Sequence, residues 1–192
     1  MLIKFKPTTP GLRGTVLVSK RELSKDKSHK SLTKKIKSTG GRNNLGRITS
    51  RAKGSGHKKR YRMIDFYRNK LDVKAKVERI EYDPNRTSFI ALVKYEDGVK
   101  NYIICPRDLN VGDDIVSGNK KEIKTGNCMP LSDIPPGTLI HNVELIEGNG
   151  GKIARSAGSS VTLSGFDSDY AILKLSSGES RKVRSACKAT IG

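Results

Sequence analysis

The chain of 192 residues is 34% hydrophobic and 5% aromatic and contains no tryptophan, which is thin for the single large core of a typical enzyme. Its 38 lysines and arginines outnumber its 19 aspartates and glutamates, so the formal charge is +19 and a polyanionic partner is indicated. No apolar run is long enough to span a membrane, and we find no amphipathic helix or lipid anchor, so we expect nucleic acid and no membrane as the partner.

The cysteines and histidines show no catalytic or metal-binding spacing. The cysteines are far apart and odd in number, which favours small half-buried side chains over a disulfide framework or a zinc site. No serine or cysteine lies in a nucleophile-elbow context. We therefore expect no enzymatic activity, no metal and no cofactor. The six residues are Cys105, Cys128, Cys187, His29, His57 and His141.

Residues 1–70 are predicted to form a basic arm. They hold 21 lysines and arginines but only 3 acidic residues, a net charge of +18. Few apolar residues recur at helical or strand spacing, so the arm cannot offset its own ordering entropy. We expect it to be extended and fixed only by its partner, with a strand predicted only over 61–66.

The arm also carries the strongest functional signal. Arginine side chains fork onto phosphates, and the glycines of blocks such as 40–47 let the backbone approach RNA closely. The asparagines of that block can reach base edges, and aromatic rings between Tyr61 and Arg68 can stack on unpaired bases, with Phe66 instead assigned to the barrel core. The alternative is a solvated basic tail, but solubility requires far less charge. The predicted RNA-binding residues of the arm are Lys34, Lys35, Lys37, Arg42, Asn43, Asn44, Arg47, Arg51, Lys53, His57, Lys58, Lys59, Arg60, Tyr61, Arg62 and Arg68.

Two small β units are predicted after the arm, which makes the fold all-β. Residues 71–126 are typical of an OB-fold barrel and residues 127–192 of an SH3-like barrel, because short alternating strands are separated by tight turns. In the first unit, strands are expected over 73–82, 88–95, 100–105 and 114–117. In the second unit, one helical turn is expected at 131–134 and strands over 139–146, 160–164, 170–175 and 179–183.

The glycine-rich loop 148–152 resembles a phosphate-binding loop only superficially. Ile146 and Ile153 stand where nucleotide hydrolysis would need a glycine and a hydroxyl residue. We expect Lys152 and the loop amides to meet an RNA phosphate instead. From the residues alone, His141 at the start of a strand is expected to be structural.

Several long blocks resemble the universal large-subunit ribosomal protein uL2 family in its bacterial or organellar form. The blocks are 37–49, 56–66, 77–86, 138–144, 150–158 and 177–183. The resemblance implies an arm, an OB-fold domain and an SH3-like domain that bind large-subunit rRNA near the subunit interface. It also implies support for subunit association and the peptidyl-transfer region, where the catalyst is RNA. By position, rRNA contact is implied for His141, Asn142, Lys152, Arg155, Ser156 and Arg181.

The chain departs from the family after Gly192, where members continue into a basic, glycine-rich tail. Three explanations are open: a separate polypeptide that supplies the tail, a reduced organellar ribosome, or a trimmed polypeptide. The first two are favoured. The Lys, Ile and Asn content favours an organelle, a mitochondrion before a plastid, with bacterial cytoplasm as the fallback. Expected partners are large-subunit rRNA, other large-subunit proteins, a tail polypeptide and the small subunit at the interface. The rival interpretation is a free-standing RNA chaperone or translation factor.

Overall fold

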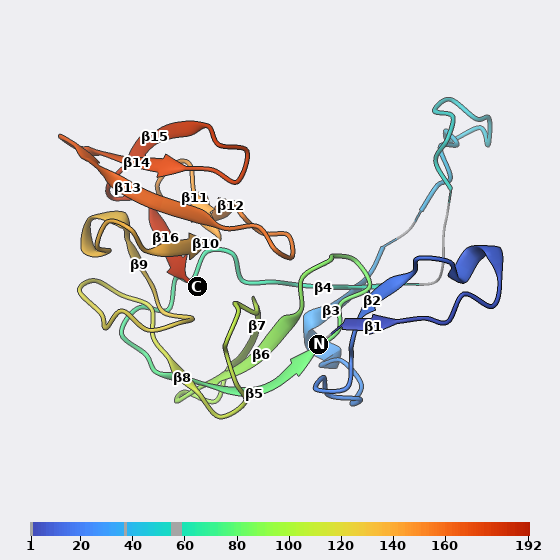
Figure 1. The fold of residues 1–192 in the computed structure, drawn as a ribbon, viewed down its shortest axis with the longest axis horizontal. Helices are drawn as coiled ribbons and strands as arrows, with labels where there is room; N and C mark the ends of the chain where they lie inside the picture. Colours follow the sequence, from blue (N-terminus) through green and yellow to red (C-terminus); the bar gives the residue numbers. More distant parts are fainter. Residues whose placement is uncertain (1, 37, 55–58) are drawn as a thin grey trace.

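A computed structural model describes residues 2–36, 38–54 and 59–192 (Figure 1). Within these ranges the chain contains short strands and three 3-10 turns, so the predicted all-β class is confirmed. None of the helical segments described is long and apolar enough to cross a membrane. Two β units lie on one side of the molecule, and the first part of the chain extends from them on the other side.

The first β unit is a four-stranded antiparallel sheet with the order β7-β6-β5-β8. Its strands are β5 (Ala75–Glu81), β6 (Ile90–Tyr95), β7 (Lys100–Ile104) and β8 (Asp114–Ile115). They fall within the four ranges predicted from alternation. Side chains such as Val77, Val93 and Ile103 form a core on one face of the sheet. On the other face Ile90, Leu92 and Tyr102 are buried as well, because Leu32 and Ile64 of the arm cover them.

The second β unit is a six-stranded sheet with the order β15-β14-β13-β10-β16-β9, so β15 lies at its edge. Its strands are β9 (Cys128–Pro130), β10 (Leu139–His141), β13 (Val161–Asp167), β14 (Tyr170–Lys174), β15 (Ser180–Arg184) and β16 (Lys188–Ile191). The predicted helical turn is η3 (Leu131–Asp133). A separate pair, β11 (Val143–Glu144) and β12 (Gly151–Ile153), lies beside the sheet.

The single strand predicted over 139–146 is divided into β10 and β11. Asn142 between them has a φ of 50°, which breaks the extended backbone. The following strand is held by Glu144, whose buried carboxylate accepts hydrogen bonds from the backbone N–H groups of Gly150 and Lys188, both at 3.0 Å. This carboxylate therefore joins β11, the glycine-rich loop and the start of β16.

The arm contains more regular structure than predicted. Strand β1 (Leu2–Lys4) pairs with β2 (Val16–Val18), and β3 (Thr33–Lys35) pairs with β4 (Arg60–Arg62). The 3-10 turns are η1 (Pro10–Leu12) and η2 (Lys30–Leu32). Strand β4 is shorter than the range predicted because Ile64 leaves it to bridge Tyr102. The expectation of an arm fixed only by RNA was therefore wrong for part of its length.

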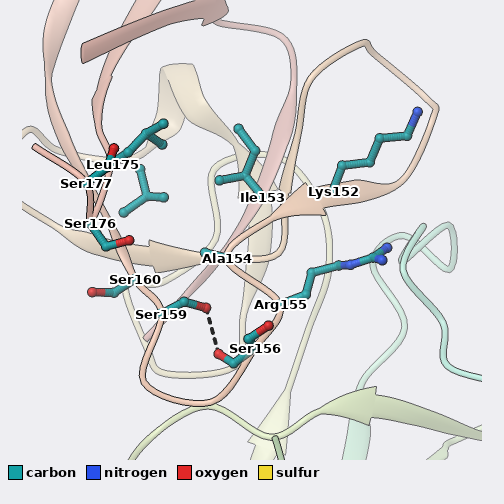
Figure 2. Close-up of a pocket in the computed structure, with 11 residues that line it drawn as sticks. Lys152, Ile153, Ala154, Arg155, Ser156, Ser159, Ser160, Leu175, Ser176 and Ser177 are labelled. Carbon is teal, nitrogen blue, oxygen red and sulfur yellow. Dashed lines mark hydrogen bonds between the residues drawn. The ribbon is translucent and has the colours of Figure 1, made fainter. Parts of the chain in front are cut away.

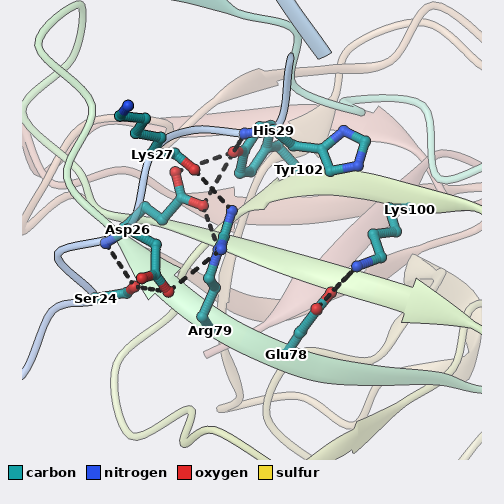
Figure 3. Close-up of polar contacts among 9 residues, drawn as sticks. Ser24, Asp26, Lys27, His29, Glu78, Arg79, Lys100 and Tyr102 are labelled. Atoms are coloured by element: carbon teal, nitrogen blue, oxygen red, sulfur yellow. Dashed lines mark hydrogen bonds and ion pairs between the residues drawn. The ribbon is translucent and has the colours of Figure 1, made fainter. Parts of the chain in front are cut away.

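One part of the arm, residues 20–32, lies against the first β unit and is called the docked segment (Figure 3). The Ser24 N–H donates to the Ile80 carbonyl at 2.9 Å, and the Arg79 guanidinium donates to the Lys27 carbonyl at 3.1 Å. The Tyr102 hydroxyl accepts from the His29 N–H at 2.8 Å and donates to the Glu81 carboxylate. These bonds attach the docked segment to the first β unit without RNA.

Candidate nucleic-acid interface

The segment between β3 and β4, described over residues 38–54 and called the projecting loop, extends away from both β units (Figure 1). Its cationic side chains are exposed, as are those at its base. They are Arg42, Arg47, Arg51 and Lys53 in the loop and Lys34, Lys35, Lys59 and Arg60 at the base. None of these takes part in an ion pair with the residues that the structure describes. Their charge is therefore available to an external polyanion.

Hydrogen bonds within the projecting loop fix its shape. The Asn43 Oδ1 accepts from the N–H groups of Leu45 at 3.0 Å and Arg47 at 2.9 Å. Gly41 has a φ of 76°, and a Cβ there would lie 2.0 Å from the Ser50 carbonyl oxygen, so only glycine fits. The side-chain oxygen of Asn43 is thus used inside the loop, and base contact by Asn43 stays a prediction. Asn44 is exposed.

The base of the loop leads into side chains that are less open than predicted. Tyr61 and Arg62 are half-buried, and the Arg62 Nη1 donates to the Arg60 carbonyl at 2.8 Å. The predicted residues Lys37, His57 and Lys58 lie outside the described residues. Twelve of the sixteen predicted arm residues therefore lie at or beside the loop and are exposed or partly exposed, and Arg68 is buried.

A second cationic surface belongs to the loop after β12. Lys152, Arg155 and Ser156 are exposed there, while Arg181 is exposed on β15. The Arg155 guanidinium carbon lies 4.3 Å from the centre of the Phe66 ring, and its Nη1 donates to the Gly151 carbonyl at 3.1 Å. The surface is thus held against the end of the arm by a cation–π contact.

Arg68 was predicted to contact RNA, but its side chain is buried and only 3% of the residue is exposed. The Nε donates to the Ser117 hydroxyl and the Nη2 to the Gly126 carbonyl, both at 3.0 Å. A buried guanidinium needs such partners because desolvation is costly. Arg68 therefore ties the end of the arm to the junction between the β units, and it is not placed to meet RNA.

His141 and Asn142 are also buried, in contrast to the rRNA contact implied by the resemblance. The His141 Nδ1 lies 2.5 Å from the Gly192 carbonyl oxygen. Burial lowers the pKa of His141 to about 4, and the positive charge of Arg68 acts in the same direction. Asn142 donates its backbone N–H to the Ala154 carbonyl at 3.0 Å and its side-chain Nδ2 to the Phe66 carbonyl at 3.4 Å. Both side chains fit a structural role, as expected for His141 from the residues alone.

Arg86 is a residue that the sequence predictions missed. Its guanidinium carbon lies 5.8 Å from the ring centres of both Tyr61 and Phe66, and its Nε donates to the buried Asp83 carboxylate at 2.7 Å. It therefore places a cation between the arm and the second cationic surface. Arg86 was missed because residues 83–86 have the composition of a turn. The only sequence feature that pointed to this region was the alternation of aromatic and basic residues over 61–68.

Among the residues that the structure describes, the remaining titratable side chains form no metal-binding or nucleophilic cluster. The three cysteines are free thiols, and burial raises the pKa of the Cys105 thiol to about 11, which makes it a poor nucleophile. Within the described ranges, no group of histidine, cysteine and acidic side chains could hold a metal ion. The main feature of the described surface is therefore exposed positive charge in a fixed shape, which suits a polyanion.

Two family models together match most of the chain. The model described as Ribosomal Proteins L2, RNA binding N-terminal domain, matches residues 29–117, and Ribosomal Proteins L2, C-terminal domain, matches residues 124–192. The large ribosomal subunit proteins uL2 of Rickettsia canadensis and Rickettsia rickettsii are 60% and 62% identical over 191 residues. These alignments cover 100% of this chain and 70% of each relative. The chain therefore belongs to the uL2 family of large-subunit ribosomal proteins.

Proposed function

We propose that the chain is a non-enzymatic structural component of the large ribosomal subunit that binds large-subunit rRNA. The observation that carries this proposal is the projecting loop, whose exposed cations have no intramolecular partner among the described residues. RNA phosphates would release condensed counterions when these side chains neutralise them. The loop then reduces the repulsion between neighbouring RNA helices, and the β units fix where it enters.

The proposed division of labour assigns residues 1–70 to the arm, 71–126 to an OB-fold domain and 127–192 to an SH3-like domain. The arm supplies the loop, while Lys152, Arg155, Ser156 and Arg181 supply a second contact. Buried residues such as Arg68 fix the position of the arm relative to the β units. The finer roles proposed with it are a position near the subunit interface and support of subunit association and the peptidyl-transfer region.

The test replaces the four cations of the projecting loop by alanine and measures binding to a large-subunit rRNA transcript at several salt concentrations. Each lost phosphate contact lowers the slope of log affinity against log salt by about 0.7 to 0.9, so we expect the slope to fall by about 3. The matched control removes four exposed lysines of the first β unit and the junction. The loop set is Arg42, Arg47, Arg51 and Lys53, and the control set is Lys74, Lys76, Lys94 and Lys124. Equal losses in both sets would contradict the proposal.

An integral component is distinguished from an exchanging factor by sedimentation. The wild-type chain should remain with the large particle through a high-salt gradient, whereas a chaperone or translation factor should dissociate, because its binding rests on salt-sensitive charge contacts alone. Recovery of the chain only in the top fractions would favour the factor.

Contacts with other large-subunit proteins are proposed for the ribbon of β1 and β2. Its apolar side chains are exposed on both faces, with Leu2 69% and Leu17 54% exposed. Aliphatic side chains gain little from phosphates, and exposed apolar patches mark protein interfaces. The flanking lysines and arginines favour a neighbour with an apolar slot rimmed by carboxylates. A photo-crosslinking residue at position 17 should give protein adducts in purified particles; adducts with RNA only would contradict this assignment.

An organellar ribosome, mitochondrial in the first instance, is the proposed location. The Lys, Ile and Asn content supports it, while the relatives named above are bacterial. A separate polypeptide that corresponds to the remaining part of the relatives and a contact with the small subunit belong to the same proposal. Mass spectrometry of large subunits purified from isolated organelles tests the location and the separate polypeptide together. Absence of the chain from the organellar subunits, together with its recovery from bacterial cytoplasm, would contradict the organellar location.

A further inference from the structure

A pocket of about 400 Å³ opens on the second β unit, between the loop after β12 and the turn that joins β14 to β15 (Figure 2). Its lining is Lys152, Ile153, Ala154, Arg155, Ser156, Ser159, Ser160, Val161, Leu175, Ser176 and Ser177. The lining contains five serines and no acidic residue. Figure 2 shows Lys152 and Arg155 on one side, with Ser156 beside Arg155, and Leu175, Ser176 and Ser177 on the opposite side.

The wall of the pocket is held in shape before any ligand arrives. The Ser159 hydroxyl and N–H both donate to the Ser156 carbonyl, at 2.6 and 3.2 Å. The Ala157 N–H donates to the Thr87 hydroxyl of the first β unit at 3.1 Å. Arg155 is fixed by Gly151 and Phe66, as described above. A preformed wall lowers the entropy cost of binding.

The pocket combines an aliphatic floor with hydroxyl groups that can donate or accept. Ile153, Val161 and Leu175 form the apolar part. No hydrogen bond to the hydroxyls of Ser160 and Ser176 is found in the part of the chain that the structure describes. Such hydroxyls can read the polar edge of a flat, mostly apolar ligand, and the nearby cations suit a ligand that carries a phosphate.

We propose that this pocket accommodates one unpaired nucleotide of the bound RNA. Its base would lie on the aliphatic floor, the serine hydroxyls would bond to its edge, and Lys152 would meet its phosphate. Sequence-specific RNA recognition commonly uses unstacked bases in this way. An acidic peptide side chain is disfavoured because it would use the cations but leave the apolar floor empty. The inference rests on the proposed RNA-binding function and adds the class of ligand.

The test titrates the ¹⁵N-labelled full chain with each nucleoside monophosphate, with ribose 5-phosphate and with inorganic phosphate. We expect at least one nucleoside monophosphate to shift the amide signals of residues 153–160 and 175–177. Ribose 5-phosphate and inorganic phosphate should not shift this set. The variants Ser176→Leu and Ser160→Leu fill the pocket and should weaken binding by about tenfold, the cost of losing one base contact. The matched control is Ser180→Leu on β15, which should bind as the wild type does.

The inference is overturned if inorganic phosphate shifts the same signals as strongly, since the site would then recognise an anion alone. It is also overturned if the pocket-filling variants bind unchanged, or if no nucleoside monophosphate shifts the pocket signals. Two filling variants guard against a folding defect in one of them. Binding of the same preparations to the large-subunit rRNA transcript separates the two proposals. If no pocket signal shifts but the transcript binds normally, only the nucleotide site is contradicted. If the wild type does not bind the transcript, the proposed function is contradicted.

Discussion

The docked segment and the projecting loop are neighbours in the same basic arm, yet one lies on the protein and the other extends from it. The docked segment has Leu23 buried and Leu32 packed on Tyr102. The loop also has apolar residues, but Leu45 and Ile48 are 73% and 62% exposed. The difference shows that net charge does not decide which part of an arm folds back. A few apolar side chains with a matching surface, supported by backbone hydrogen bonds, decide it.

The largest effect is expected from removal of the projecting loop. Lys35 and Arg60 are direct partners in the β3–β4 pair, so an Asn-Gly turn can replace residues 36–59 without disturbing either strand. Affinity for the rRNA transcript should fall by about hundredfold or more at physiological salt, while the thermal unfolding temperature stays unchanged. The control replaces the same residues by an uncharged Gly/Ser linker of equal length, which should lose as much affinity. A linker variant that binds normally would show that length, and not charge, matters.

Substitution of two arginines by glutamine should give opposite results. Arg68→Gln removes two buried hydrogen bonds of a charged group and should lower the free energy of unfolding by about 3 kcal/mol. Arg47→Gln should leave stability unchanged and weaken RNA binding. Urea unfolding and transcript binding, measured on both variants, check that one variant loses stability and the other loses RNA binding. If Arg68→Gln weakened RNA binding without loss of stability, the buried arginine would belong with the loop.

Acid should loosen the junction between the β units. Because the pKa of His141 is lowered by burial, the unfolded chain binds an extra proton between pH 6.5 and about 4. The contribution of His141 to the free energy of unfolding is fully present above pH 6.5. It decreases as the pH falls, by about 2 kcal/mol between pH 7 and 5. Urea unfolding at pH 7 and 5 measures the change, and His141→Gln should remove this part of the dependence; an unchanged dependence would refute it.

The smallest effect is expected for Tyr102→Phe. Loss of the hydroxyl leaves the His29 N–H without an acceptor and removes a donor to Glu81, so the free energy of unfolding should fall by about 1 to 2 kcal/mol. Limited proteolysis should cut the docked segment faster than in the wild type. The exposed Tyr170→Phe serves as the control and should change neither quantity. Equal cleavage of all three proteins would show that the Tyr102 hydroxyl does not help to hold the segment.

The two β units were predictable because their signals are local. Residues 90–93 form a continuous apolar run, and Asp97-Gly98 marks the following hairpin turn, where the backbone of Gly98 has a φ of 81°. The docked segment was not predictable because Leu23 and Leu32 are isolated apolar residues. Leu32 packs against Ile90, Leu92 and Tyr102, which lie about sixty residues or more further along the chain, and no periodicity reports such a contact.

The candidate site was predictable in its charge but not in its burial. Arg47 and Arg68 both lie in the basic arm, yet only Arg47 faces outward. Burial of Arg68 depends on acceptors at Ser117 and Gly126, which only the tertiary structure brings near. The internal role of the Asn43 side-chain oxygen was not predictable for a similar reason, since it closes a turn whose shape the composition did not specify.

The outermost strand of the six-stranded sheet, β15, has a consequence for the life of the protein before its RNA is made. An unpaired sheet edge is a template on which a second copy can stack and begin an aggregate. Along this edge Arg181, Lys182 and Arg184 are exposed, so two copies brought together there would repel each other. The same positive charges thus act as a safeguard against self-association while newly made chains await their nucleic-acid scaffold.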